Sequence, residues 1–178
     1  VGPPLRDCFR LCHVPEERIE EACLIYRHFY NEEGGKYDAN VYPGIMELLS
    51  KLKSEGNLLY IATSKADVLA KDIGKHFGFD KYFDGFFGAC LDGSRALKKD
   101  ILHQGLVLTD SSLPAVRIGD TYLDMVGANE NKIPSFGVVW GYGDKKKRVE
   151  CGAKKICTSC SELLDALENR TVSDFKND

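Results

Sequence analysis

The stretch AVRIGDTYLDMVGANENKIPSFGVVWG, residues 115–141, sets the pattern for most of the chain. It predicts a buried strand over 115–119, a short helix carrying Asp124 and a second apolar strand over 135–140. Asp120 directly follows the first strand, at the edge where open α/β sheets place their ligands. Asp124 lies one helical turn further on, so its side chain can face the same point.

Two carboxylates that face one point repel each other unless a cation lies between them. Oxygen ligands of this hard type favour Mg²⁺, so Asp120 and Asp124 are candidate metal ligands. The spacing alone also allows a plainer interpretation, in which Asp120 caps the helix and Asp124 lies on the surface.

Alternating strands and helices extend this pattern over most of the sequence. Strands are predicted at 58–62, 83–89, 115–119, 135–140 and 155–157, and helices at 45–52, 67–77, 98–104 and 161–168. Units of this length and order predict an α/β fold with a doubly wound, mostly parallel sheet and helices on both faces. This core spans residues 41–170. It follows a small helical part at 1–40, with helices over 5–11 and 15–31, and precedes a tail at 171–178.

Composition limits the classes of partner. The 178 residues carry a net charge of −3, which argues against a dedicated surface for nucleic acid or anionic membrane. The one basic run, 145–148, is short, and we interpret it as a solvated loop. No apolar run reaches transmembrane length and no signal peptide is recognisable, so we expect a cytoplasmic protein. The sequence leaves the oligomeric state open.

Seven cysteines are scattered along the chain without zinc-finger spacing. Cys157 and Cys160 have the C-x-x-C spacing of a redox motif or half of a metal site. No second pair completes four ligands, and we expect buried or incidental free thiols.

Two further strand and helix ends carry polar side chains suited to a phosphate. Thr63 and Ser64 end one strand, where a hydroxyl and free backbone N–H groups can bind phosphate oxygens, or can simply cap the next helix. Lys98 begins a later helix and could bring a positive charge to the same edge, or lie on the surface. Taken with Asp120 and Asp124, these residues would form a site for a phosphoryl group and Mg²⁺.

At this point the sequence resembles the haloacid dehalogenase-like (HAD) hydrolase superfamily, and most closely its phosphoglycolate phosphatase-like branch. The matching segments are Tyr-Pro-Gly at 42–44, Ile-Ala-Thr-Ser-Lys at 61–65, Phe-Asp-Gly-Phe-Phe-Gly at 83–88, Ser-Arg-Ala-Leu-Lys at 94–98, Ile-Gly-Asp-Thr-Tyr-Leu-Asp-Met at 118–125 and Gly-Val-Val-Trp-Gly-Tyr-Gly at 137–143. Gly-Pro-Pro-Leu-Arg at 2–6 is similar to part of that branch's helical cap, so the resemblance implies a partial cap at 1–40.

The resemblance implies an Mg²⁺-dependent phosphatase that transfers a phosphoryl group from a small phosphate monoester, such as phosphoglycolate, to an enzyme aspartate and then to water. It assigns a role to each candidate residue: phosphate binding to Thr63 with the backbone of Ser64, steadying of the nucleophile to Lys98 rather than Lys99, direct Mg²⁺ ligation to Asp120, indirect Mg²⁺ ligation to Asp124, and a substrate contact to Arg6. For Arg6 a surface salt bridge is the plainer alternative.

The family's Asp-x-Asp motif, which supplies the nucleophile at the end of the first strand, has no counterpart here. The aspartates before the core are Asp7 and Asp38, and neither follows an apolar strand. We therefore expect an additional amino-terminal segment of about 40 residues in the biological protein, and little or no turnover by residues 1–178 alone. A sheet without that strand would leave two rows of backbone groups unpaired. The alternative is a catalytically inert HAD-like module that binds phosphate or a partner.

Overall fold

The computed structural model describes residues 5–90, 97–109 and 113–169. The chain divides into two compact units, residues 1–40 and residues 41–178, and each is described by itself. Among the described residues, no helix is both long and apolar enough to cross a membrane. The predicted tail at 171–178 and the matching residues 2–4 and 94–96 lie outside the described residues.

The first unit is helical, as its periodicity predicts. It contains α1 (Leu5–Leu11), the 3-10 turn η1 (Glu16–Arg18), α2 (Ile19–Glu32) and a second 3-10 turn, η2 (Gly35–Tyr37). Ile19 and Cys23 are its buried residues, and Phe9 contacts Tyr26 edge-on with ring centroids 6.3 Å apart. The helix predicted from residue 15 begins as a single 3-10 turn after Pro15 and continues as α2.

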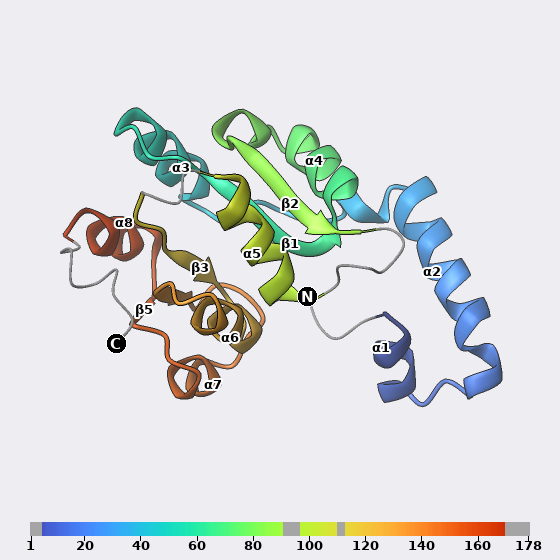
Figure 1. Cartoon of the computed structure of the whole chain (residues 1–178). Helices are drawn as coiled ribbons and strands as arrows, with labels where there is room; N and C mark the ends of the chain where they lie inside the picture. Colours follow the sequence, from blue (N-terminus) through green and yellow to red (C-terminus); the bar gives the residue numbers. More distant parts are fainter. Residues whose placement is uncertain (1–4, 91–96, 110–112, 170–178) are drawn as a thin grey trace. The chain divides into compact units, whose positions relative to one another are not determined.

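The described residues of the second unit form five parallel strands in two sheets (Figure 1). The strands are β1 (Tyr60–Ala66), β2 (Gly85–Ala89), β3 (Arg117–Gly119), β4 (Ser135–Val138) and β5 (Lys155–Cys157); the helices are α3 (Ile45–Ser54), α4 (Asp67–His76), the 3-10 turn η3 (Asp80–Tyr82), α5 (Lys98–Leu108), α6 (Tyr122–Glu130), α7 (Lys145–Glu150) and α8 (Cys160–Glu168). One sheet pairs β1 with β2, and the other has the order β3-β4-β5. All these pairings are parallel, which confirms the predicted α/β class.

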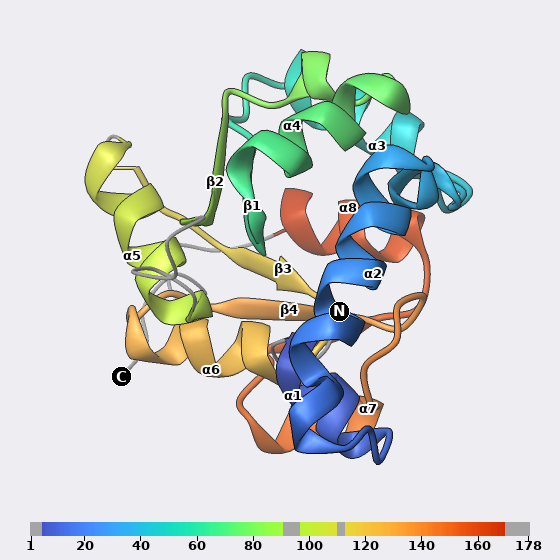
Figure 2. The same ribbon diagram turned by 90° about the vertical axis from the view of Figure 1, so that its right-hand side faces the viewer.

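Helices cover both faces of each sheet, because successive side chains along a strand point to opposite faces. Phe86 contacts Gly74 of α4, whereas Phe87 contacts Gly105 of α5, so these helices flank β2 on opposite sides. In the second sheet, Ile118 packs toward α3 and α8, while Gly119 is covered by α6. Figure 2 shows α8 and α6 on opposite sides of β3 and β4.

The main hydrophobic core lies between α3, α8 and the three-stranded sheet. Its buried members are Leu48, Leu52, Phe136, Val138, Cys157, Leu163, Ala166 and Leu167. These positions follow the period of 3.6 on the helices and the period of 2 on β4, which is why the sequence pattern identified the elements. The core fixes β3 and β4, and thereby the strand end that carries Asp120.

The edge strands β1 and β3 of the two sheets are not paired with each other. Among the described residues, no ladder of backbone hydrogen bonds joins β1 to β3. The Arg117 guanidinium instead donates a hydrogen bond to the carbonyl of Ala62, with an N···O distance of 3.0 Å. A side chain thus satisfies one acceptor at the edge where the sequence predicts that a strand is missing.

Two local predictions are wrong. Thr63 and Ser64 do not end the strand predicted over 58–62: β1 continues to Ala66, which pairs with Ala89 after an irregularity in register, so these residues lie within the strand. Residues 145–148 are not a solvated loop. Asp144 caps α7 by accepting a hydrogen bond from the Lys147 backbone N–H, and this short helix turns the side chain of Arg148 inward.

The core generates a stability prediction. Leu163→Ala should lower the free energy of unfolding by about 2 to 5 kcal/mol, because it leaves a cavity at a side chain that is 2% exposed. Urea denaturation monitored by circular dichroism measures this loss. Leu108→Ala on α5, where the side chain is 65% exposed, is the matched control and should change stability by no more than about 0.5 kcal/mol. Equal losses in the two variants would contradict the assigned core.

Candidate functional site

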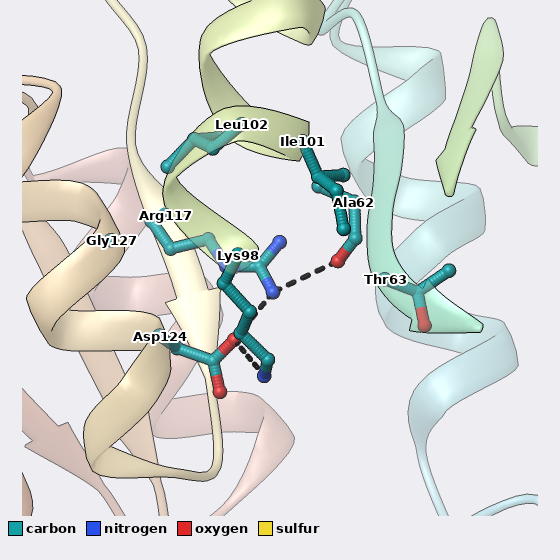
Figure 3. Close-up of a pocket in the computed structure, with 8 residues that line it drawn as sticks. All are labelled: Ala62, Thr63, Lys98, Ile101, Leu102, Arg117, Asp124 and Gly127. Carbon is teal, nitrogen blue, oxygen red and sulfur yellow. Dashed lines mark hydrogen bonds and ion pairs between the residues drawn. The ribbon is translucent and has the colours of Figure 1, made fainter. Parts of the chain in front are cut away.

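A pocket lies where β1 and β3 approach the first turns of α5 and α6. Figure 3 shows the eight side chains and backbone segments that line it: Ala62 and Thr63 from β1, Lys98, Ile101 and Leu102 from α5, Arg117 from β3, and Asp124 and Gly127 from α6. The elements come from distant parts of the sequence, and they meet at one edge as the parallel topology requires.

Asp124 reaches the pocket because of two local features. Gly119 ends β3 against α6, and a Cβ at that position would overlap the carboxylate of Asp124. Thr121 is the residue before α6, and both its backbone N–H and its hydroxyl donate to Oδ2 of Asp124, at 3.1 and 2.8 Å. This reciprocal cap holds the carboxylate at the start of the helix. The plainer alternative is therefore wrong, because Asp124 is 2% exposed and Asp120 does not cap the helix.

Two cations meet on the other oxygen of Asp124. Lys98 Nζ lies 2.6 Å from Oδ1, and a guanidinium nitrogen of Arg117 lies 2.5 Å from the same atom. Burial raises the pKa of Asp124, but the charges of Arg117 and Lys98 and their hydrogen bonds outweigh it and lower the pKa to about 2. The carboxylate is therefore ionised at neutral pH, and both of its oxygens already have partners.

Arg117 is a site residue that the sequence interpretation missed. It lies within an apolar strand, where the pattern alone marks it only as a strand residue. Arg117 is two positions before Gly119, however, so strand alternation places both on the face that α6 covers. Asp124 projects from α6 toward that face, so the spacing of Arg117 and Gly119 was the available signal.

Asp120 is held by the loop that follows β4. Its Oδ2 accepts a hydrogen bond from the backbone N–H of Tyr142 at 2.9 Å. Gly141 and Gly143 both pack directly on Asp120, and a Cβ at Gly141 would collide with its side chain. A Cβ at Gly143 would collide with its carbonyl oxygen. The Gly-Tyr-Gly segment at 141–143 is therefore needed for close approach to Asp120.

The other predicted residues have different settings. Lys98 is confirmed as a neighbour of Asp124, whereas Thr63 lies on β1 away from that ion cluster (Figure 3). Its hydroxyl accepts a hydrogen bond from the backbone N–H of Lys65, and Ser64 is exposed. Arg6 belongs to the first unit and forms an exposed ion pair with Glu20 at 2.8 Å.

The donor set for a magnesium ion is incomplete within the described residues. Asp120 offers Oδ1, for which the described residues provide no hydrogen-bond donor, while both oxygens of Asp124 are occupied by protein groups. No group of three or more His, Cys, Asp or Glu side chains gathers for a metal in the described parts of the chain. Asp120 is thus suited to bind a metal ion directly through Oδ1. Asp124 is suited to hold the charged groups near Asp120.

Cys157 and Cys160 are free thiols with separate surroundings. Cys157 is fully buried in the core, and the thiol of Cys160 lies 3.5 Å from the carbonyl of Pro43. Burial raises the pKa of both thiols, which disfavours the reactive thiolate.

Comparison with known proteins gives the family. A family model described as haloacid dehalogenase-like hydrolase matches residues 1–138. The chain belongs to this family. This HAD-like chain is 35% identical over 173 residues to a protein named 5'-nucleotidase from Pseudomonas aeruginosa, covering 95% of the chain and 77% of that protein. It is 38% identical over 144 residues to tyrosine-protein kinase PtkA of Mycobacterium tuberculosis, covering 80% of the chain but 49% of that protein.

Solved structures agree with this assignment. A haloacid dehalogenase-like hydrolase from Streptococcus pneumoniae superimposes with a TM-score of 0.84 at 34% identity, covering 93% of the HAD-like chain and 77% of that structure. Phosphoglycolate phosphatases also occur among its relatives. The predicted superfamily is confirmed, and the chain is a phosphatase-like hydrolase of that family.

The buried ion cluster generates a pH-dependent prediction. The pKa of Asp124 in the folded protein, about 2, lies below its unfolded value of about 3.9, so its stabilising contribution is present above about pH 4 and is lost as the pH falls toward 2. In Asp124→Asn, the loss of stability on acidification should be smaller than in wild type by about 2.5 kcal/mol. It should also destabilise the protein by about 3 to 5 kcal/mol at pH 7, because Lys98 and Arg117 lose their shared counterion.

Urea unfolding at several values between pH 7 and pH 2 measures both effects. Asp165→Asn changes an exposed carboxylate on α8 and should retain the wild-type pH dependence. Stability curves for wild type and Asp124→Asn that coincide from pH 7 to pH 2 would show that the ion cluster does not stabilise the fold.

Proposed function

We propose that the protein is an Mg²⁺-dependent phosphatase that hydrolyses a small phosphate monoester through an aspartyl-phosphate. The observation that carries this proposal is the convergence of Lys98 and Arg117 on Asp124 beside the strand end that bears Asp120. Positive charge beside a strand-end carboxylate supports this proposal, because a transferring phosphoryl group needs cations and Mg²⁺ needs oxygen ligands.

In this proposal, the nucleophilic aspartate lies outside the printed residues, on a strand between β1 and β3. The sheet is divided at this edge, and one acceptor there, the Ala62 carbonyl, is satisfied by the Arg117 side chain instead of by a strand. A strand inserted there would lie beside Thr63 within β1 and end close to Asp120, which follows β3.

The chain's own residues would then have separate tasks. Thr63 would donate its hydroxyl to a phosphate oxygen, assisted by the backbone N–H of Ser64, a residue that is exposed. Lys98 would turn toward the nucleophile and the phosphoryl oxygens, while Arg117 keeps Asp124 neutralised. Asp120 would hold magnesium directly and Asp124 would act indirectly. When bound, magnesium would supply charge neutralisation for the transferring phosphoryl group.

The substrate is proposed to be a small phosphorylated molecule. Two of the relatives are named phosphoglycolate phosphatase and 5'-nucleotidase. The helical unit at 1–40 is proposed as part of the cap that selects the substrate, with Arg6 as a contact to a substrate carboxylate or phosphate. A net charge of −3 favours neither nucleic acid nor an anionic membrane as a partner.

A comparison of two adjacent lysines tests the proposal. In the protein expressed from its complete gene, Lys98→Ala should reduce kcat for p-nitrophenyl phosphate in MgCl₂ by about 100-fold or more, because the charge beside the phosphoryl group is lost. Lys99→Ala changes an exposed neighbour on α5 and should stay within about twofold of wild type.

Controls separate the enzyme from the inert alternative. Removal of magnesium with EDTA should abolish turnover, as should Asp120→Asn. If the complete protein shows no metal-dependent turnover of any phosphomonoester, then the inert phosphate- or partner-binding module is the better description. A rate measured with residues 1–178 alone and abolished by Asp120→Ala would refute the proposal of an external nucleophile.

A further inference from the structure

Arg148 is a buried cation next to Asp120 that the proposed mechanism does not use. It lies on α7 with 1% of its surface exposed, the largest of the fully buried side chains among the described residues. Gly137 of β4 provides the space for it, because a Cβ there would lie 3.2 Å from the Arg148 Cδ atom. The Arg148 side chain therefore packs on the face of the sheet over Gly137, where β4 has no side chain of its own.

The guanidinium is bound by carbonyl groups. One nitrogen, Nη1, donates to the carbonyl oxygens of both Asp120 and Gly143, the latter at 2.6 Å. No carboxylate within the described residues forms a salt bridge with it, and its Nε is buried without a hydrogen-bond partner. The positive charge of Arg148 also acts on Asp144. The pKa of Asp144 is lowered mainly by the hydrogen bond from the Lys147 backbone N–H, and the charge of Arg148 lowers it further.

This arrangement is costly if its purpose is to fill space. Burying a guanidinium without a carboxylate partner carries a large desolvation penalty, and an apolar side chain of similar size would avoid it. What Arg148 supplies and an apolar residue cannot is a link between two loops. It connects the main chain at Asp120, after β3, to the main chain at Gly143, after β4.

We propose that Arg148 is a positioning residue that fixes the backbone at Asp120 so that its carboxylate is aimed at the metal. Three contacts then hold Asp120: Arg148 on its carbonyl, the Tyr142 N–H on Oδ2, and the close packing of Gly141 on its side chain. Oδ1 is left for the ion. This inference rests on the proposed function, because it concerns the same metal ligand.

Calorimetric titration of the complete protein with MgCl₂ tests the proposal. Arg148→Leu, which fills the space but cannot donate, should weaken Mg²⁺ binding at least tenfold. Arg148→Lys retains the positive charge and can still donate a hydrogen bond to a carbonyl oxygen, so it should weaken Mg²⁺ binding by a smaller factor than Arg148→Leu does. Lys146→Leu on the same helix, where the side chain is 86% exposed, is the matched control and should bind Mg²⁺ as wild type does.

The outcomes distinguish the two proposals. Wild-type Mg²⁺ affinity in folded Arg148→Leu and Arg148→Lys, together with lost binding in Asp120→Asn, would overturn the positioning role and leave the proposed function intact. Absence of Mg²⁺ binding in wild type, or unchanged binding in Asp120→Asn, would overturn both. If Arg148→Leu does not fold, Arg148→Lys decides: the positioning role requires weaker Mg²⁺ binding at an unchanged melting temperature, and wild-type affinity refutes it.

Discussion

The arrangement of the α/β unit depends on the ion pairs that the buried carboxylate of Asp124 forms with Lys98 and Arg117. Lys98 comes from α5, which packs on β1 and β2, and Arg117 comes from β3 of the other sheet. Both cations bind the same oxygen of Asp124, and Arg117 also binds the Ala62 carbonyl on β1. Since no backbone ladder joins the two sheets in the described residues, this cluster is a specific polar link between them.

The cluster has the energetics of a buried ion network. Desolvation opposes the Asp124 charge, and two cations together outweigh that cost, which is why its pKa is low in spite of burial. The loss of Asp124 would leave the two cations without their shared counterion. A phosphatase can use such a balance, because a phosphate that enters can draw on positive charge already held in place.

A second constraint acts on Asp120 through its main chain. Gly141 and Gly143 allow the loop after β4 to approach, and Arg148 joins the two backbones from below the surface. In the proposed function, preorganisation of this kind matters because a metal ligand displaced by about 1 Å can cost orders of magnitude in rate. Membership of the family indicates the class of reaction. The contacts of Asp120 with the glycines and Arg148 instead determine how accurately its carboxylate is positioned.

The sequence by itself determined the order of strands and helices, the α/β class and the family, and it predicted that Asp120, Asp124 and Lys98 lie at one edge of the sheet. These depend on local periodicity and on side chains at predictable strand and helix ends. The tertiary structure alone decided that Thr63 lies within β1, that Arg117 neutralises Asp124, and that Arg148 is buried behind Asp120 rather than solvated. The register of β1 is set by β2, and a charged side chain is buried only when partners from distant segments surround it. Neither condition is visible in the residues next to it in the chain.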